Sequence, residues 1–161
     1  MTAILAMALA ASQPAWILTP DGLGPVKIGM TQAQVAKALG GTLTGDAIES
    51  DDICVEKDSS KLPGVGLMFE EKKLVRISLV PDSKIATLRG VRAGATAAKI
   101  RRAYPTGLLS EPNAYLERPA EYLTFWTVRG KKGVRFETDE KRQVYVIHAG
   151  TAAIQYIEGC A

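Results

Sequence analysis

The chain has 161 residues, of which 47% are hydrophobic, and a formal net charge of +3. This length suits one compact domain or two small halves that share a core. The apolar content and the lack of a low-complexity tract exclude an intrinsically disordered chain. Residues 1–88 hold 8 Lys/Arg and 10 Asp/Glu, a net charge of −2, whereas residues 89–161 hold 12 and 7, a net charge of +5. The basic half is compatible with an anionic partner, although a solvated charged surface is the commoner cause of such a bias.

The N-terminus has the pattern of a secretory signal peptide. Residues 3–11 form an uninterrupted apolar run, in which Ala8-Leu9-Ala10 supplies an A-x-A cleavage pattern ahead of a polar break. The run is shorter than the roughly 20 apolar residues that a transmembrane helix needs. We therefore predict a signal peptide over residues 1–12, no transmembrane segment, and a periplasmic or secreted protein. A buried N-terminal helix is the alternative.

The two cysteines, Cys54 and Cys160, lie far apart in the sequence. In an oxidising compartment two cysteines most simply pair, so we predict a Cys54–Cys160 disulfide that ties the last residues to the first half. Closing a loop of about 100 residues contributes at most about 4–5 kcal/mol in the chain-entropy model. Two buried free thiols in a cytosolic protein are the alternative.

A glycine hinge and a capped helix organise the first half. An apolar run over residues 16–19 stops at a turn signal over residues 20–22, and the hinge follows at residues 24–31. Thr31 can cap a helix by accepting a backbone hydrogen bond, and Gln34 can bond back, which is the capping-box arrangement. We expect this helix to end at Gly40.

Three strand candidates come after this helix. Residues 42–53 are polar and acidic, which indicates a loop or a second weak helix. Residues 54–56 suggest a short strand, and the alternating runs 65–69 and 74–79 suggest a hairpin connected by residues 70–73. Pro81 closes the first unit.

The second half repeats this order. Residues 90–96 echo the hinge, and Thr96 begins a helical pattern that Pro105 ends. After a loop over residues 108–121, strands are expected at 122–128, 134–138 and 144–149, with a further edge strand at 153–157.

Each half is thus predicted to have a helix followed by three strands. This order favours antiparallel hairpins, because a parallel sheet needs a long crossover between neighbouring strands. We predict an α+β fold, a tandem repeat of a short helix or helical hairpin plus an antiparallel three-stranded sheet, with the helices on one face. The repeats would span residues 13–81 and 82–161 and form one compact unit. The other face of the sheet would meet solvent or a partner.

The opening of the first unit resembles that of small exported bacterial proteins. The shared residues are Gly22-Leu23-Gly24-Pro25-Val26-Lys27-Ile28-Gly29-Met30-Thr31, with Val35 and Leu39-Gly40. By this motif the chain is similar to the β-lactamase-inhibitor-protein-like superfamily, which includes the small lipoproteins of the outer-membrane assembly machinery. That family's unit is a helical hairpin followed by an antiparallel sheet, sometimes duplicated, and its members bind other proteins. The resemblance implies protein binding but identifies no binding residue.

The second copy departs from this pattern. The replacements are Ala95 for Met30, Lys99 for Gln34, and Tyr104-Pro105 for Leu39-Gly40. The cysteine that anchors the assembly lipoproteins is also absent. The resemblance is therefore specific only at the first hinge.

Motifs for cofactors, metals and catalysis are weak. Residues 24–31 have the outline of a phosphate-binding loop, but Met30 stands where that loop needs lysine, so we expect no nucleotide or other cofactor. His148, the only histidine, lies in a predicted strand without a G-x-S-x-G elbow, and we predict no enzyme. A zinc site from Cys54, Cys160 and His148 lacks the usual short spacings, so we predict no metal. A hydrolase that uses scattered loop carboxylates is the alternative.

The predicted binding surface is the second face of the strand at 122–128. Alternation puts Leu123 and Phe125 on the helix-covered face and the residues between them on the other. Tyr and Trp are enriched in recognition surfaces, because they bury a large area with little loss of entropy. The predicted binding residues are Tyr122, Thr124, Trp126, Arg129, Lys131 and Arg135. The alternative is that the N-terminal arm or the C-terminal run covers this face and that the aromatic residues are core.

We therefore predict a non-enzymatic exported binding protein that recognises another protein of the cell envelope through an open sheet face. It would act as an inhibitor of an envelope enzyme or as an assembly partner. A structural envelope protein without a specific ligand is a further alternative. Nucleic acid is not expected, because an exported, disulfide-bonded protein seldom meets it and the chain has no recognition motif. The oligomeric state does not follow from the sequence.

Overall fold

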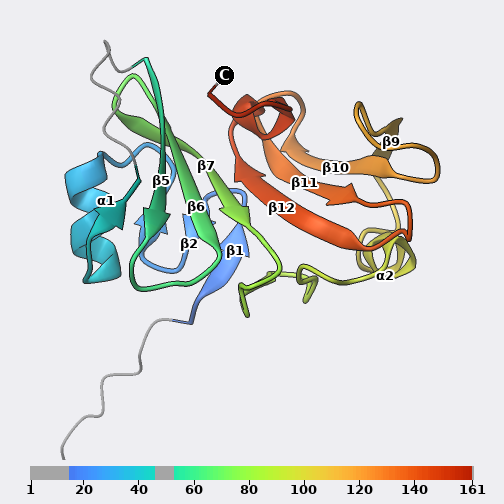
Figure 1. Ribbon diagram of the computed structural model, residues 1–161, viewed down its shortest axis with the longest axis horizontal. Coiled ribbons are helices and arrows are strands. Elements are labelled where there is room, and N and C mark those ends of the chain that lie inside the picture. The colour runs from blue at the N-terminus through green and yellow to red at the C-terminus, as the bar shows by residue number, and fades with distance from the viewer. Residues whose placement is uncertain (1–14, 46–52, 161) are drawn as a thin grey trace, which may run out of the picture.

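The computed structural model describes residues 15–45 and 53–160, so the predicted signal peptide over residues 1–12 lies outside the described residues. The fold is mostly β, since 42% of the described residues are in strands and 14% in helices. In the described part of the chain, the strands form one sheet of eight and one of four (Figure 1).

The larger sheet is antiparallel throughout and has the strand order β4-β5-β6-β7-β12-β11-β10-β9. Its strands are β4 (Leu43–Thr44), β5 (Cys54–Ser59), β6 (Val65–Glu70), β7 (Lys73–Leu79), β9 (Leu108–Pro112), β10 (Glu121–Val128), β11 (Lys132–Thr138) and β12 (Val144–Gly150). Because β7 pairs with β12, the hairpins of the two halves join into one continuous sheet (Figure 1).

The smaller sheet is mixed and has the order β3-β2-β1-β8. Its strands are β1 (Ile17–Thr19), β2 (Gly22–Leu23), β3 (Val26–Lys27) and β8 (Ala86–Thr87). β1 pairs with β2 antiparallel and with β8 parallel. The helices are α1 (Gln32–Leu39), α2 (Ala97–Ala103) and the 3-10 helix η1 (Ala152–Gln155).

The hydrophobic core lies on one face of the larger sheet. Leu123, Phe136, Ile147 and Leu79 are successive cross-strand neighbours from β10 to β7, and all are fully buried. Core members from the elements that cover this face are Leu18 and Leu23 of the smaller sheet, Val35 of α1 and Ile100 of α2. The smaller sheet and the two α-helices thus cover one face of the larger sheet, and the burial of these apolar side chains is the main source of stability.

The predicted capping box at the start of α1 is confirmed. The Thr31 hydroxyl accepts from Gln34 N at 3.3 Å, and Thr31 N donates to Gln34 Oε1 at 2.9 Å. The helix ends at Gly40, whose φ of 65° is the left-handed conformation that glycine adopts without a steric cost.

Both α-helices start beside a strand of the larger sheet. Gly29 N donates to Leu74 O at 2.7 Å, and Gly94 N donates to Val144 O at 2.7 Å. Leu74 N and Val144 N each donate back to the hinge that contacts them. The two hinges therefore have matching backbone surroundings.

The predicted fold class is nevertheless wrong. The chain is not a tandem repeat of helical hairpins with sheets, because the described part of each half has one short α-helix and strand dominates. Residues 17–27 and 86–87, which we did not assign to a second sheet, form the four-stranded sheet that covers the core. The physical reason is the length of its strands: two or three residues carry too little alternation to be recognised. The expected edge strand at 153–157 is largely the 3-10 helix η1.

The predicted disulfide is confirmed, since Cys54 and Cys160 are bonded to each other. It joins the end of the chain to the start of β5 in the larger sheet.

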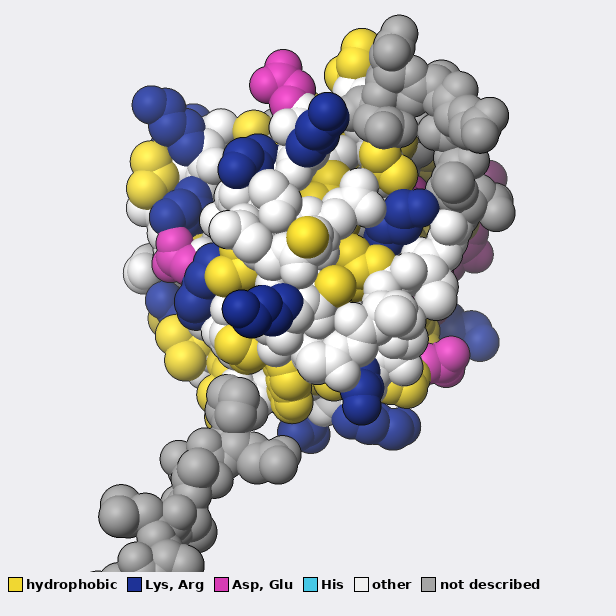
Figure 2. Space-filling model, turned by 90° about the vertical axis from the view of Figure 1, so that its left-hand side faces the viewer, with side chains coloured by type: hydrophobic (Ala, Val, Ile, Leu, Met, Phe, Trp, Pro, Cys, Tyr) yellow, Lys and Arg dark blue, Asp and Glu magenta, His cyan; other side chains and the backbone are white. Residues whose placement is uncertain are grey.

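On the side of the molecule where α1 lies, the described charged and apolar side chains do not gather into one patch. Figure 2 shows Lys and Arg side chains scattered over this side, with apolar side chains in small separate groups among the residues it describes. The candidate sites therefore come from the opposite half, around β9–β12 and the C-terminal segment.

Candidate functional site

The structure places the six predicted binding residues in two different environments. Tyr122, Thr124 and Arg135 are buried on the second face of the larger sheet. Trp126 is half-buried beside Gly133, where an added Cβ would lie 2.8 Å from the indole. Arg129 and Lys131 are exposed in the β10–β11 turn. The expectation of an open face is therefore wrong at the three buried positions.

The C-terminal segment, residues 151–160, packs on part of this second face. Ala153 and Ile154 of η1 are buried, and η1 contacts β7, β11 and β12. Arg76 of β7 fastens the segment, because its Nη1 donates to Tyr156 O at 3.0 Å and to Ala153 O at 3.3 Å. This cover is the alternative that the sequence had left open.

The loop over residues 113–120 packs against the other end of the same face. Ala114 N donates to the Tyr122 hydroxyl at 3.0 Å, and the Asn113 amide donates to the Tyr145 hydroxyl at 3.1 Å. With these bonds the Tyr122 side chain is a structural residue rather than a free contact.

Two arginines lie under this cover with incomplete hydrogen bonding. Arg76 pairs with Glu56 at 2.7 Å, and Arg135 lies 3.9 Å over the Tyr122 ring and 3.5 Å from Glu111. Both are only 4% exposed, and the Nε of each has no hydrogen-bond partner among the described residues. Burial lowers the pKa of Arg76, although Glu56 opposes this shift. Such pairs position side chains more than they add stability.

Ser78, His148 and Glu137 form a connected row on the same face. The Ser78 hydroxyl lies 2.8 Å from His148 Nδ1, and His148 Nε2 lies 3.4 Å from Glu137 Oε1. Burial lowers the pKa of His148, against the opposing effect of Glu137. Burial alone would raise the pKa of Glu137, but His148, Tyr145 and Arg135 lower it on balance.

This row has the residue types of a hydrolytic triad, but its environment does not suit catalysis. His148 and Glu137 are buried, and Ser78 lines neither of the two pockets described below. A triad also needs donors aimed at an oxyanion beside an accessible nucleophile. We interpret the row as a buried polar network of the sheet.

An exposed surface of aromatic and aliphatic side chains lies on the C-terminal segment and the loop beside it. It consists of Tyr115, Tyr156 and Ile157, and we call it the tyrosine surface. These residues are 66%, 42% and 46% exposed. They line one shallow hollow of about 560 Å³ together with the Cys54–Cys160 disulfide.

Both tyrosine hydroxyls are held by carboxylates. The Tyr115 hydroxyl donates to Glu158, and this bond raises the pKa of Tyr115. A hydrogen bond with Glu70 likewise raises the pKa of Tyr156. Both phenols are therefore protonated donors at neutral pH, and each ring is oriented before any partner arrives.

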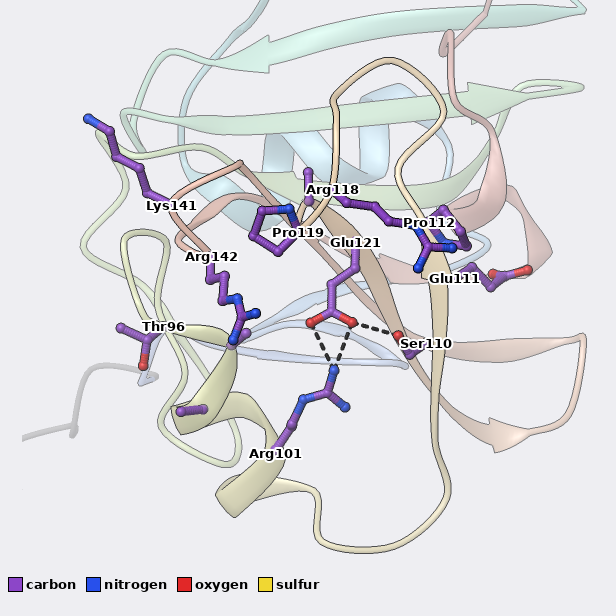
Figure 3. Close-up of a pocket in the computed structure, with 13 residues that line it drawn as sticks. Thr96, Arg101, Ser110, Glu111, Pro112, Arg118, Pro119, Glu121, Lys141 and Arg142 are labelled. Carbon is purple, nitrogen blue, oxygen red and sulfur yellow. Dashed lines mark hydrogen bonds and ion pairs between the residues drawn. The ribbon is translucent and has the colours of Figure 1, made fainter.

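A second hollow, the α2 pocket, lies between α2, β9, the loop that follows β9 and the turn after β11 (Figure 3). Its volume is about 850 Å³. At its centre the Glu121 carboxylate accepts from Arg101 Nη2 at 2.7 and 2.8 Å and from the Ser110 hydroxyl at 2.5 Å. Arg118 and Arg142 lie on either side of this carboxylate (Figure 3).

Comparison of the chain with known protein families, curated proteins and solved structures gives no match. The resemblance noted at the first hinge stays a prediction.

Metal and membrane chemistry find no support in the described ranges. No group of three or more His, Cys, Asp or Glu side chains in residues 15–45 and 53–160 could hold a metal ion. No helix in those same ranges has the length and apolar character needed to cross a membrane.

Sequence reasoning missed the tyrosine surface and the α2 pocket. The sequence held one signal for the tyrosine surface. Tyr156 lies four residues before Cys160, and the predicted disulfide brings this segment close to Cys54. The pocket brings together residues from four separate segments, and no local pattern connects them.

Proposed function

We propose that the protein is a non-enzymatic binding protein that recognises another protein through the tyrosine surface. We further propose that it works in an oxidising compartment, as a periplasmic or secreted protein. The observation that carries the proposal is the exposure of Tyr156 and Ile157 on the C-terminal segment, and of Tyr115 on the loop beside it. The Cys54–Cys160 disulfide is compatible with such a compartment.

Support comes first from the rigidity of this surface. The disulfide holds one end of the segment, Arg76 holds its backbone, and carboxylates hold both phenols. Rigid tyrosines bury a large area at a small entropic cost, which is why they are frequent at the energetic centre of protein interfaces.

The charge around the tyrosine surface indicates the chemistry of the partner. Glu70 and Glu158 line the same hollow, and no Lys or Arg side chain is among its described lining residues. A partner surface with an apolar group beside a basic side chain would fit both features. Oppositely charged rims speed association and exclude wrong partners.

One observation favours the alternative of a hydrolase that uses loop carboxylates, because Glu111 and Glu121 line the same pocket. Glu121 is bonded to Arg101 and Ser110, and Glu111 lies 3.5 Å from Arg135. Because arginine and serine side chains already engage these carboxylates, neither is free to act on a substrate, so binding is the better supported function.

The test is site-specific photo-crosslinking in the full-length protein. A photo-reactive phenylalanine derivative replaces Ile157 in one variant and Leu88, an exposed apolar residue outside the tyrosine surface, in the matched control. We expect one discrete protein adduct from position 157 that is missing from position 88. The same adducts from both positions, or none from position 157, would contradict the proposal.

A further inference from the structure

The walls of the α2 pocket consist partly of short apolar side chains and partly of basic ones. Ala97 and Ala98 of α2 form one wall, and Pro112, Pro119 and Ala120 form another. These short side chains leave room for a ligand, and a volume of about 850 Å³ is within the range of small-molecule sites.

The charges of the pocket do not cancel. Arg101 is neutralised by Glu121, and Glu111 faces Arg135, which is not a lining residue. The cations that remain are Arg118, Lys141 and Arg142. The side chains of Arg118 and Arg142 make no hydrogen bond or ion pair with the described residues, and Figure 3 places them on opposite sides of Glu121, whereas Lys141 points away.

The backbone at Arg142 is a second, independent observation. Arg142 has a φ of 60°, in the left-handed region that favours glycine or asparagine. Its turn is held by Asp139, whose carbonyl accepts from Arg142 N at 2.9 Å and whose side chain accepts from Gln143 N at 2.8 Å. The turn thus directs an arginine toward the pocket from a position where other residues would be less strained.

We propose that the α2 pocket binds a small ligand that carries an oxyanion, either a carboxylate or a phosphoryl group. The guanidinium groups of Arg118 and Arg142 donate to the oxyanion, and the rest of the ligand lies against the alanine and proline walls. Planar guanidinium groups bind both kinds of oxyanion through paired hydrogen bonds. The Arg101–Glu121 pair forms the floor of the pocket and does not contact the oxyanion.

The experiment is an NMR titration of the full-length protein with inorganic phosphate and, separately, with succinate, at constant ionic strength. The variants are Arg118→Gln and Arg142→Asn, and the matched control is Arg129→Gln in the exposed β10–β11 turn. Asparagine tolerates the left-handed conformation, so Arg142→Asn keeps the turn while it removes the charge. Thermal unfolding of each variant checks that the fold is intact.

We expect saturable shifts of the amides that line the pocket, and each pocket variant should weaken binding by about tenfold or more, as loss of a charge-assisted contact does. The control should bind like the wild type. Tighter binding of phosphate identifies a phosphoryl ligand, and tighter binding of succinate identifies a carboxylate. Absence of saturable shifts with both probes, or equal affinity in all four proteins, would overturn the proposal.

Discussion

His148 gives the buried polar network a readout in solution, because it is the only histidine of the chain. Burial holds the pKa of His148 below its ordinary value of 6.5, and the nearby charges of Arg76 and Arg135 act in the same direction against Glu137. The unfolded chain then binds more protons than the folded protein below about pH 6.5. The free energy of unfolding should therefore fall as the pH drops below that value.

We predict that His148→Gln removes this first acid-dependent loss of stability, which urea unfolding between about pH 5 and pH 8 measures. The wild type should show a second loss below about pH 4.5, since the lowered pKa of Glu137 stabilises the folded protein only above its own titration. This second loss should be smaller in the variant, because His148 contributes most to lowering the pKa of Glu137. An unchanged pH dependence in the variant, measured beside the wild type in the same buffers, would show that His148 does not titrate on unfolding.

At the scale of single elements, the β6–β7 hairpin is tight and strained. Its two-residue turn consists of Glu71 and Lys72, with φ of 46° and 66°. Both angles belong to the left-handed region, which costs non-glycine residues about 1–2 kcal/mol each. Such turns normally contain Asn-Gly.

We predict that Lys72→Gly raises the free energy of unfolding by about 0.5–1 kcal/mol, because the relief of strain exceeds the added entropy of the unfolded chain. The matched control is Lys131→Gly in the β10–β11 turn, where φ is not positive and no gain is expected. Urea unfolding measures both. Equal effects of the two substitutions would contradict the strain that we infer at Lys72.

At the scale of the whole molecule, the Cys54–Cys160 disulfide joins the end of the chain to the larger sheet. We predict that the double substitution Cys54→Ser and Cys160→Ser lowers the free energy of unfolding by about 2–5 kcal/mol. It should also speed amide exchange in residues 151–160 more than in β10–β12, because the segment then loses its one covalent link while the strands keep their ladder hydrogen bonds. Uniform exchange changes across both regions would mean that the disulfide does not act through this segment.

Local patterns in the sequence predicted several elements well. Capping chemistry predicted the capping box at Thr31 and Gln34, and the number of cysteines predicted the disulfide. Alternation predicted the strands β6, β7 and β10 to β12. The smaller sheet was missed because its strands are too short to alternate. The cover over Tyr122 was left open because alternation shows which residues share a face but not what packs against it.

The exposure of the candidate binding residues was harder to predict than the strands, because alternation does not show what packs against a face of the sheet. Alternation correctly separated Leu123 and Phe125 from Tyr122, Thr124 and Trp126, since Leu123 belongs to the main core cluster and Phe125 packs against it. Exposure, however, depends on the C-terminal segment and on the loop over residues 113–120, whose positions are set by Arg76, Asn113 and the disulfide. These contacts join residues that lie far apart in the sequence.

The affinity of the full-length protein for the partner captured at position 157 tests recognition through the tyrosine surface. The double variant Tyr156→Ser and Ile157→Ser should bind that partner about 100-fold more weakly, because it removes two exposed contact residues and leaves the backbone that Arg76 holds. Arg118→Gln, in the α2 pocket, should bind it like the wild type. Equal affinity of all three proteins would contradict recognition through the tyrosine surface.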